Sequence, residues 1–75
     1  MDVKIGDTVK AIFNKYGKHS IIGEVWKIRT NEEDLRGTWV SIRVNGGDAA
    51  DRLVNRMVQQ RFNVLIPIKD VKAII

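Results

Sequence analysis

The most regular alternation of apolar and polar residues lies between Thr38 and Asn45. Branched aliphatic side chains occupy one face of this segment, and an indole, a hydroxyl and a guanidinium occupy the other. The aliphatic residues are Val40, Ile42 and Val44, and the others are Trp39, Ser41 and Arg43. This alternation predicts a β-strand that buries its aliphatic face, because burying three branched side chains outweighs exposing the other face. Trp39 and Arg43 are therefore expected on the outer face.

A second strand, Ile21–Ile28, is expected to form the centre of the fold. Its branched and aromatic residues favour a strand. Val25 and Ile28 are three positions apart, so strict alternation would place them on opposite faces. We therefore predict a β-bulge near Trp26 or Lys27, which would turn both side chains towards the core and bend the strand. A glycine ahead of the bend leaves room for another backbone to approach closely.

Shorter strands are predicted on both sides of these two. Thr8–Asn14 alternates, and a polar loop returns the chain into the central strand as an antiparallel hairpin. Asn63–Ile66 is apolar and ends before Pro67, which cannot donate a ladder hydrogen bond. Ile68–Val71 is expected to form one 3₁₀ turn, and Lys72–Ile75 a final strand that could pair with the first.

One helix is predicted, from Ala49 to about Gln60. Two glycines end the preceding strand, and Asp48 is a suitable N-cap residue. Beyond it, apolar residues recur at helical spacing and the remaining positions are polar. The apolar residues are Ala50, Leu53, Val54, Met57 and Val58. A strand would instead bury charged residues with this apolar set, so the pattern favours a helix that docks on the sheet.

Five short strands and one helix predict a mainly β fold in a single domain, residues 1–75. The expected architecture is a partly closed five-stranded barrel with one inserted α-helix at about residues 49–60. The bend in the central strand is the feature that a small barrel requires.

Two segments resemble known families. Gly6–Lys10, a basic loop and Gly23–Ile28 resemble the KOW motif of ribosomal proteins and transcription elongation factors, whose pattern is Gly-Asp-x-Val, a Lys/Gly-rich loop and Gly-x-Val-x-x-Ile. The loop Lys15–Ser20 departs from this motif, because it is longer and lacks the second glycine. Residues 65–74 resemble the closing strand, 3₁₀ turn and last strand of SH3-like barrels, the architecture to which KOW domains belong. The resemblance implies an SH3-like barrel and nucleic-acid binding. The helix has no counterpart in the minimal KOW motif. The aromatic pattern of SH3 domains that bind proline-rich peptides is absent, so that activity is not implied.

Composition narrows the classes of function. The chain has 75 residues, no cysteine, and 13 basic against 9 acidic residues, which gives a net charge of +4. The acids cluster at Glu32–Asp34, so the rest of the surface is cationic and is suited to a polyanionic partner. The absence of cysteine, of a signal-like segment and of any long apolar run predicts a cytoplasmic protein without a membrane partner.

Catalytic chemistry is not indicated. A zinc site needs three or four suitable ligands, whereas the chain has one histidine, His19, which is expected to be solvated in a lysine-rich turn. Neither Ser20 nor Ser41 has a convincing base, and no glycine-rich phosphate-binding loop is present. We therefore expect no enzyme activity, no metal and no cofactor.

The first candidate binding segment is the loop containing Lys15, Tyr16 and Lys18. An aromatic ring among bases can stack on a nucleobase while the cations contact phosphates. The alternative is a solvated hairpin loop with its tyrosine packed on the edge of the fold.

The second candidate is the outer face that carries Trp39 and Arg43, expected near Lys27 and Arg29. A large indole on a sheet is expected to be covered by the helix, by another subunit or by a ligand. Arg56 on the outer face of the helix is the last candidate, with an ordinary solvated helix face as its alternative.

Together these features predict a small non-catalytic module that binds RNA or DNA through backbone phosphates. The alternative is a protein-interaction or homo-oligomeric assembly module, in which Trp39 and the apolar edges are buried by another subunit. A third interpretation is an oligomeric enzyme with its site at the centre of the assembly, for which no residue of the sequence argues.

Overall fold

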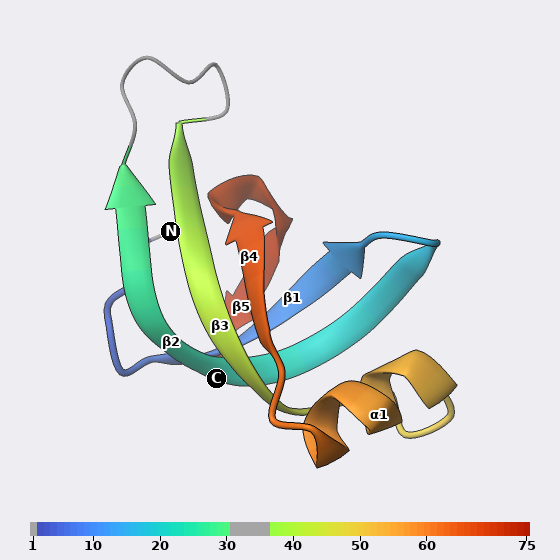
Figure 1. The fold of residues 1–75 in the computed structure, drawn as a ribbon. Coiled ribbons are helices and arrows are strands. Elements are labelled where there is room, and N and C mark those ends of the chain that lie inside the picture. Colours follow the sequence, from blue (N-terminus) through green and yellow to red (C-terminus); the bar gives the residue numbers. More distant parts are fainter. Residues whose placement is uncertain (1, 31–36) are drawn as a thin grey trace.

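The longest strand, β2 (Lys18–Thr30), lies at the centre of a single antiparallel sheet. A computed structural model of the protein describes residues 2–30 and 37–75. Five strands pair in the order β4-β3-β2-β1-β5, and Figure 1 shows that they wrap around a common interior. The other elements are β1 (Thr8–Asn14), β3 (Thr38–Gly47), α1 (Arg52–Gln59), β4 (Asn63–Pro67), the 3₁₀ helix η1 (Ile68–Asp70) and β5 (Val71–Ile74).

The predicted bulge in β2 is confirmed. Val25 pairs with Ile42 of β3 and Lys27 pairs with the preceding residue of β3, so Trp26 is the extra residue. Val25 is fully buried and Ile28 packs against the core, which is the outcome that the bulge was predicted to permit. Because a bulge increases local twist and bends its strand, β2 curves strongly along its length (Figure 1) and pairs with both β1 and β3.

Gly23 lies at a second irregularity in the same ladder, between Ile22 and Gly23. A Cβ atom built there would overlap the carbonyl oxygen of Arg43 and would lie 2.6 Å from Cγ2 of Ile42. The backbones of β2 and β3 therefore approach too closely for any side chain at this position. This is the close approach that the glycine was expected to allow.

The core consists of branched aliphatic residues together with Ala11 and Met57, and it contains no aromatic ring. Its buried members are Val9, Ala11, Ile21, Val25, Val40, Ile42, Val44, Val54, Met57, Val64, Ile66 and Val71. The aliphatic face of β3 is therefore buried as predicted. The helix completes this core, because α1 packs against β3 and β2 through Val54 and Met57.

The helix is shorter than predicted, and its predicted cap is wrong. Asp51 is the N-cap, because its Oδ1 accepts hydrogen bonds from the backbone N–H groups of Leu53 and Val54 at 2.9 and 3.3 Å. Asp48 instead accepts from the N–H of Ala50 at 3.0 Å, which forms a separate turn. Residues 49 and 50 therefore precede the helix, and Ala50 is exposed. Leu53, expected to be buried, is only half-buried.

The mainly β class with one helix is confirmed, but the sheet does not close into a barrel. Pro67 is the last residue of β4, and η1 leads directly into β5. β5 pairs with β1, as predicted for the last strand. β4 and β5 are the two edges of the sheet. The 3₁₀ turn thus joins the two edge strands and partly closes the structure without extending the ladder.

The crossing of β2 and β3 predicts the effect of one methyl group. Gly23→Ala should lower the free energy of unfolding by about 1–3 kcal/mol or more, because the added Cβ must displace backbone atoms in a packed interior. Denaturant unfolding measures this difference.

Gly46→Ala is the matched control on the partner strand. Its added Cβ would meet only the side chain of Ile22, at ordinary distances of 3.6 Å from Cβ and 4.0 Å from Cγ2. A similar loss of stability in both variants would show that the close approach at Gly23 is not the cause.

Candidate functional site

A hydrogen-bonded ion pair connects the β1–β2 hairpin to the helix. His19 Nδ1 lies 2.6 Å from Oδ2 of Asp51, the N-cap residue, and His19 Nε2 lies 3.3 Å from the carbonyl oxygen of Tyr16. The expectation that His19 is solvated is therefore wrong. Asp51 uses one carboxylate oxygen for the helix and the other for His19, so the hairpin tip has a defined position relative to α1.

This hydrogen bond shifts the pKa of both partners. It raises the pKa of His19 above its ordinary value of 6.5, and partial burial opposes the shift. The same bond lowers the pKa of the Asp51 carboxyl below its ordinary value of 3.8. The charged forms of both residues are thus favoured together.

Tyr16 projects its ring from the tip of the hairpin. Its backbone has a φ of +59°, in the left-handed region, and Gly17 follows with a φ of +110°. The Tyr16 side chain is 88 % exposed, and Lys15 Nζ lies 5.6 Å from the centre of its ring. The predicted alternative, a tyrosine packed on the edge of the fold, does not fit this exposure.

A hollow of about 180 Å³ lies between the hairpin tip and the helix. We call it the hairpin–helix hollow. Three aromatic rings and the apolar face of α1 line it, with two cations among the lining residues. The lining residues are Phe13, Lys15, Tyr16, Leu53, Arg56, Met57, Gln60 and Phe62.

A second hollow, of about 370 Å³, lies beside Trp39. We call it the Trp39 hollow. It is bordered by the end of β1, by β4 and by η1. The lining residues are Ile12, Phe13, Asn14, Lys15, Trp39, Leu65, Ile66, Pro67, Lys69 and Asp70. Phe13 and Lys15 line both hollows, so the two adjoin at the end of β1.

Trp39 is half-buried. In the strand register it lies between Arg29 of β2 and Pro67 of β4. No residue of α1 is among those lining the Trp39 hollow. The Trp39 hollow is therefore formed by strand and 3₁₀ residues without the helix.

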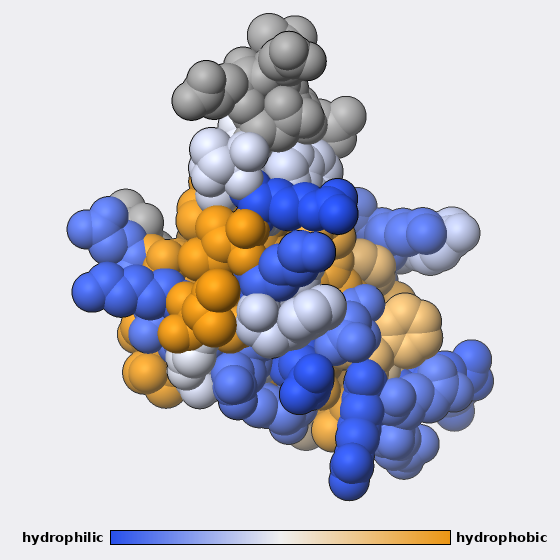
Figure 2. All heavy atoms as spheres, turned by 60° about the vertical axis from the view of Figure 1, so that its left-hand side comes forward, coloured by the Kyte–Doolittle hydropathy of each residue, from blue (hydrophilic) through white to orange (hydrophobic). Residues whose placement is uncertain are grey.

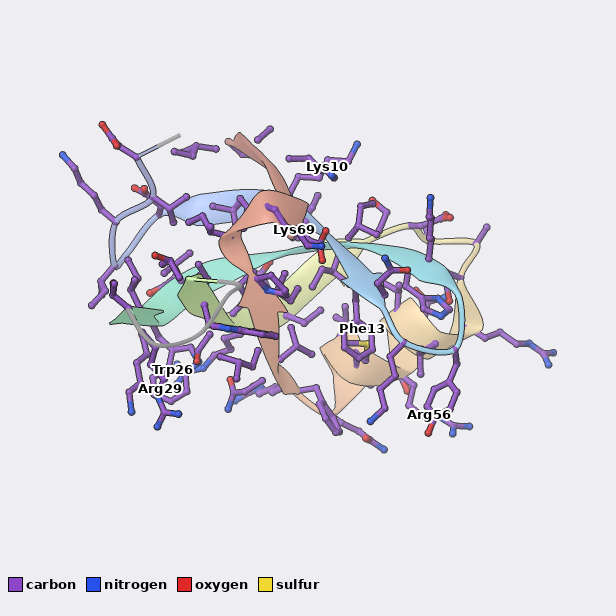
Figure 3. All side chains as sticks on the ribbon, turned by 90° about the horizontal axis from the view of Figure 1, so that it is seen from above. Lys10, Phe13, Trp26, Arg29, Arg56 and Lys69 are labelled. Atoms are coloured by element: carbon purple, nitrogen blue, oxygen red, sulfur yellow. The ribbon has the colours of Figure 1, made fainter. Side chains whose placement is uncertain are left out.

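The structure divides the predicted binding residues into groups. Lys15, Tyr16 and Arg56 meet at the hairpin–helix hollow, and Lys18 begins β2 just after the hairpin tip. In Figure 3, Arg56 and Phe13 lie towards one end of the molecule, whereas Arg29 lies beside Trp26 at the other. Trp39 occupies the region between these groups, because its hollow reaches Lys15 while its register partner is Arg29.

Arg43 and Lys27 do not join either hollow. Arg43 pairs with Glu24 in the register and lines a separate depression with Glu24 and Arg61. Lys27 is exposed beside Ser41. Trp39, Ser41 and Arg43 nevertheless share the outer face of β3. Arg29 lies opposite Trp39 and Lys27 opposite Ser41 in the register, so a shared binding patch on this face stays a prediction.

The cations of the described surface are not neutralised by acidic partners. Across residues 2–30 and 37–75, the one ion pair is that of His19 with Asp51, so no lysine or arginine there pairs with an acid. In the same part of the chain, no three histidine, cysteine, aspartate or glutamate side chains are close enough to hold a metal ion. None of the helices found there has the length and apolar character needed to cross a membrane. The acidic segment Glu32–Asp34 lies outside the described residues.

Comparison with known proteins adds no family to these observations. No family model matches the chain, and no curated protein and no solved structure is similar enough to count as a match. The resemblance to KOW and SH3-like domains therefore stays a prediction from the quoted residues.

Sequence reasoning missed Phe13, Phe62 and Lys69 as surface-lining residues. Phe13 follows the alternation of β1 and packs against the core, but it is only half-buried and borders both hollows. Phe62 follows the helix and is 50 % exposed. An apolar ring directly after a helix, with arginine before it and asparagine after it, was a signal that sequence reasoning could have used.

The His19–Asp51 pair predicts a pH dependence of stability. Because the folded-state pKa of His19 is raised, its contribution is complete below pH 6.5 and is lost as the pH rises through that raised pKa. The lowered pKa of Asp51 makes its contribution present above pH 3.8 and lost as the pH falls through the folded-state value. The pair should therefore stabilise the protein most between pH 3.8 and pH 6.5, the ordinary pKa values of the two groups.

The measurement compares wild-type protein with His19→Gln by denaturant unfolding from about pH 5 to about pH 8, the interval in which histidine changes charge. We expect the wild-type advantage to be largest at the acidic end and to shrink as the pH rises. Asp48→Asn is the control, because its side chain caps a turn without contacting His19. A wild-type advantage that is constant across the range would contradict the assignment.

Proposed function

We propose that the protein is a non-catalytic module of the cytoplasm that binds RNA or DNA mainly through backbone phosphates. The observation that supports the proposal most is Lys15, a cation without an acidic partner, placed between two adjoining hollows that are lined by aromatic rings. Polyanion contact needs free cations, and base contact needs accessible rings. Both are available at this one surface.

The distribution of charge agrees with contacts to phosphate rather than to an acidic protein pocket. Lys15, Lys18 and Arg56 are exposed and come from the hairpin and the helix, which are separate elements. Such cations position a nucleic acid without reading its sequence, because every nucleotide carries the same phosphate. The proposed module is therefore expected to bind with little sequence preference.

Self-assembly is the second candidate, and the edges of the sheet favour it. β4 and β5 carry exposed apolar side chains, Leu65 at 48 % and Ile74 at 44 % exposure. Figure 2 shows apolar surface gathered in the middle of one face, with long hydrophilic side chains around it. Unpaired strand edges of this kind can pair with a second copy. Sedimentation of the protein without nucleic acid distinguishes this candidate.

Salt dependence tests the proposed phosphate contacts. If about four phosphates are neutralised, the slope of log affinity against log salt should be about −3.6 on duplex DNA and about −2.8 on a single strand. Replacing Lys15 and Lys18 together by alanine should make the duplex slope about 1.8 shallower and weaken binding to all sequences alike. Gel-shift titrations at several salt concentrations give both quantities.

The matched control removes the same charge elsewhere. Lys4 and Lys10 are also exposed, and Lys10 lies far from Arg56 in Figure 3. Replacing both by alanine should leave the slope near the wild-type value. Equal losses in the two double variants would indicate a general charge effect without a defined surface. No wild-type binding to single- or double-stranded DNA or RNA at low salt would refute the proposal and favour self-assembly.

A further inference from the structure

The hairpin–helix hollow is built from two stretches that are far apart in the sequence, residues 13–16 and 53–62. Phe13 comes from β1, Tyr16 from the hairpin tip and Phe62 from the three residues between α1 and β4. Leu53 and Met57 contribute the apolar face of the helix. The hollow therefore exists only because the inserted helix docks against the hairpin.

The size of the hollow limits its occupant. Drug-sized ligands occupy pockets of about 300–1,000 Å³, whereas this hollow measures about 180 Å³. A single planar ring system is the scale of group that it suits. Aromatic rings around an apolar floor favour a flat, polarisable group that can stack.

Charge identifies the class of occupant. Lys15 and Arg56 line the hollow, one from the hairpin and one from the helix, and no acidic residue is among its lining residues. Lys15 Nζ also lies 5.6 Å from the centre of the Tyr16 ring, so a cation and a stacking surface are offered together. A planar group with an anion attached on each side matches this arrangement.

We infer that the hairpin–helix hollow binds one unstacked base of a single-stranded nucleic acid, with Lys15 and Arg56 contacting the phosphates on either side. This inference rests on the proposed function and adds a preference for single strands. In a duplex the faces of the bases are already stacked on their neighbours, so a duplex offers no base to the hollow.

The His19–Asp51 pair prepares the hollow for binding. It joins the hairpin that carries Lys15 and Tyr16 to the N-cap residue of the helix that carries Arg56. The two walls of the hollow are therefore held at a set separation before a ligand arrives. A preformed site loses less conformational entropy on binding than one that must assemble.

The experiment compares three fluorescent probes of equal length: oligo(dT), the same backbone with every base removed, and a duplex. The abasic probe retains the phosphates and lacks the rings. Wild-type protein should bind oligo(dT) at least about five-fold more tightly than the abasic probe, the effect expected for one stacked base. The ratio of the two affinities isolates the contribution of the base.

Two variants should reduce this ratio towards one. Tyr16→Asn removes the ring and keeps a residue that tolerates the left-handed backbone, and Phe62→Ser removes a second ring. Ile5→Asn is the control, because Ile5 is 66 % exposed and does not line the hollow. Arg56→Gln should weaken binding to both oligo(dT) and the abasic probe, whereas Arg52→Gln on the same helix should not.

The Met57 methyl group supplies a readout that does not depend on any variant. The chain has two methionines, so Met1 is an internal reference when methionine methyl groups are isotopically labelled for NMR. Ring currents from a bound base should shift the Met57 signal with oligo(dT) and leave it unchanged with the abasic probe.

The outcomes separate this inference from the proposed function. Equal binding of oligo(dT) and the abasic probe, with a salt-dependent affinity and a stationary Met57 signal, would overturn the base site and leave the phosphate-binding function standing. Failure of all three probes to bind would overturn both. A shifted Met57 signal together with an affinity ratio that falls in Tyr16→Asn and Phe62→Ser, but not in Ile5→Asn, would establish the site.

Discussion

The close crossing of β2 and β3 at Gly23 is the constraint on which the rest of the structure depends. Because Gly23 has no side chain, the two strands approach each other there more closely than a Cβ atom would allow. The bulge at Trp26 then bends β2, so that this one strand pairs with both β1 and β3. The bend turns the ends of the sheet towards each other, which leaves only η1 to join the two edge strands. The curved sheet encloses the aliphatic core.

The strands and the bulge were predictable because they depend on patterns local to the chain. Alternation in β3 and the three-residue spacing of Val25 and Ile28 carried enough information to place both. The helix boundary was harder, because Asp48 and Asp51 are both good capping residues and the tertiary contact with His19 favours the second. Whether the sheet closes depends on how β4 and β5 meet, which no local pattern specifies.

The candidate surface was predictable in part. Lys15 and Tyr16 were identified as an aromatic ring among cations, and Arg56 as an exposed cation, but their meeting in one hollow depends on the docking of α1. Alternation shows which face a side chain takes and not how deeply it is covered, so it does not show that Phe13 is only half-buried. Trp39 and its register neighbour Arg29 were named together from the sequence, whereas Glu24, the register neighbour of Arg43, was not.

The left-handed backbone of Tyr16 has a further consequence for how this protein balances stability against use. A residue with a Cβ atom in that conformation costs about 1–2 kcal/mol relative to the ordinary right-handed one, a cost that glycine avoids. A hairpin optimised only for folding would therefore carry glycine at position 16 as well as at position 17, the two positions with positive φ. Here one of them bears a large ring that is 88 % exposed and adds little to the core. The tip of the hairpin thus lowers the folding stability of a small domain and in return holds an aromatic group exposed to solvent.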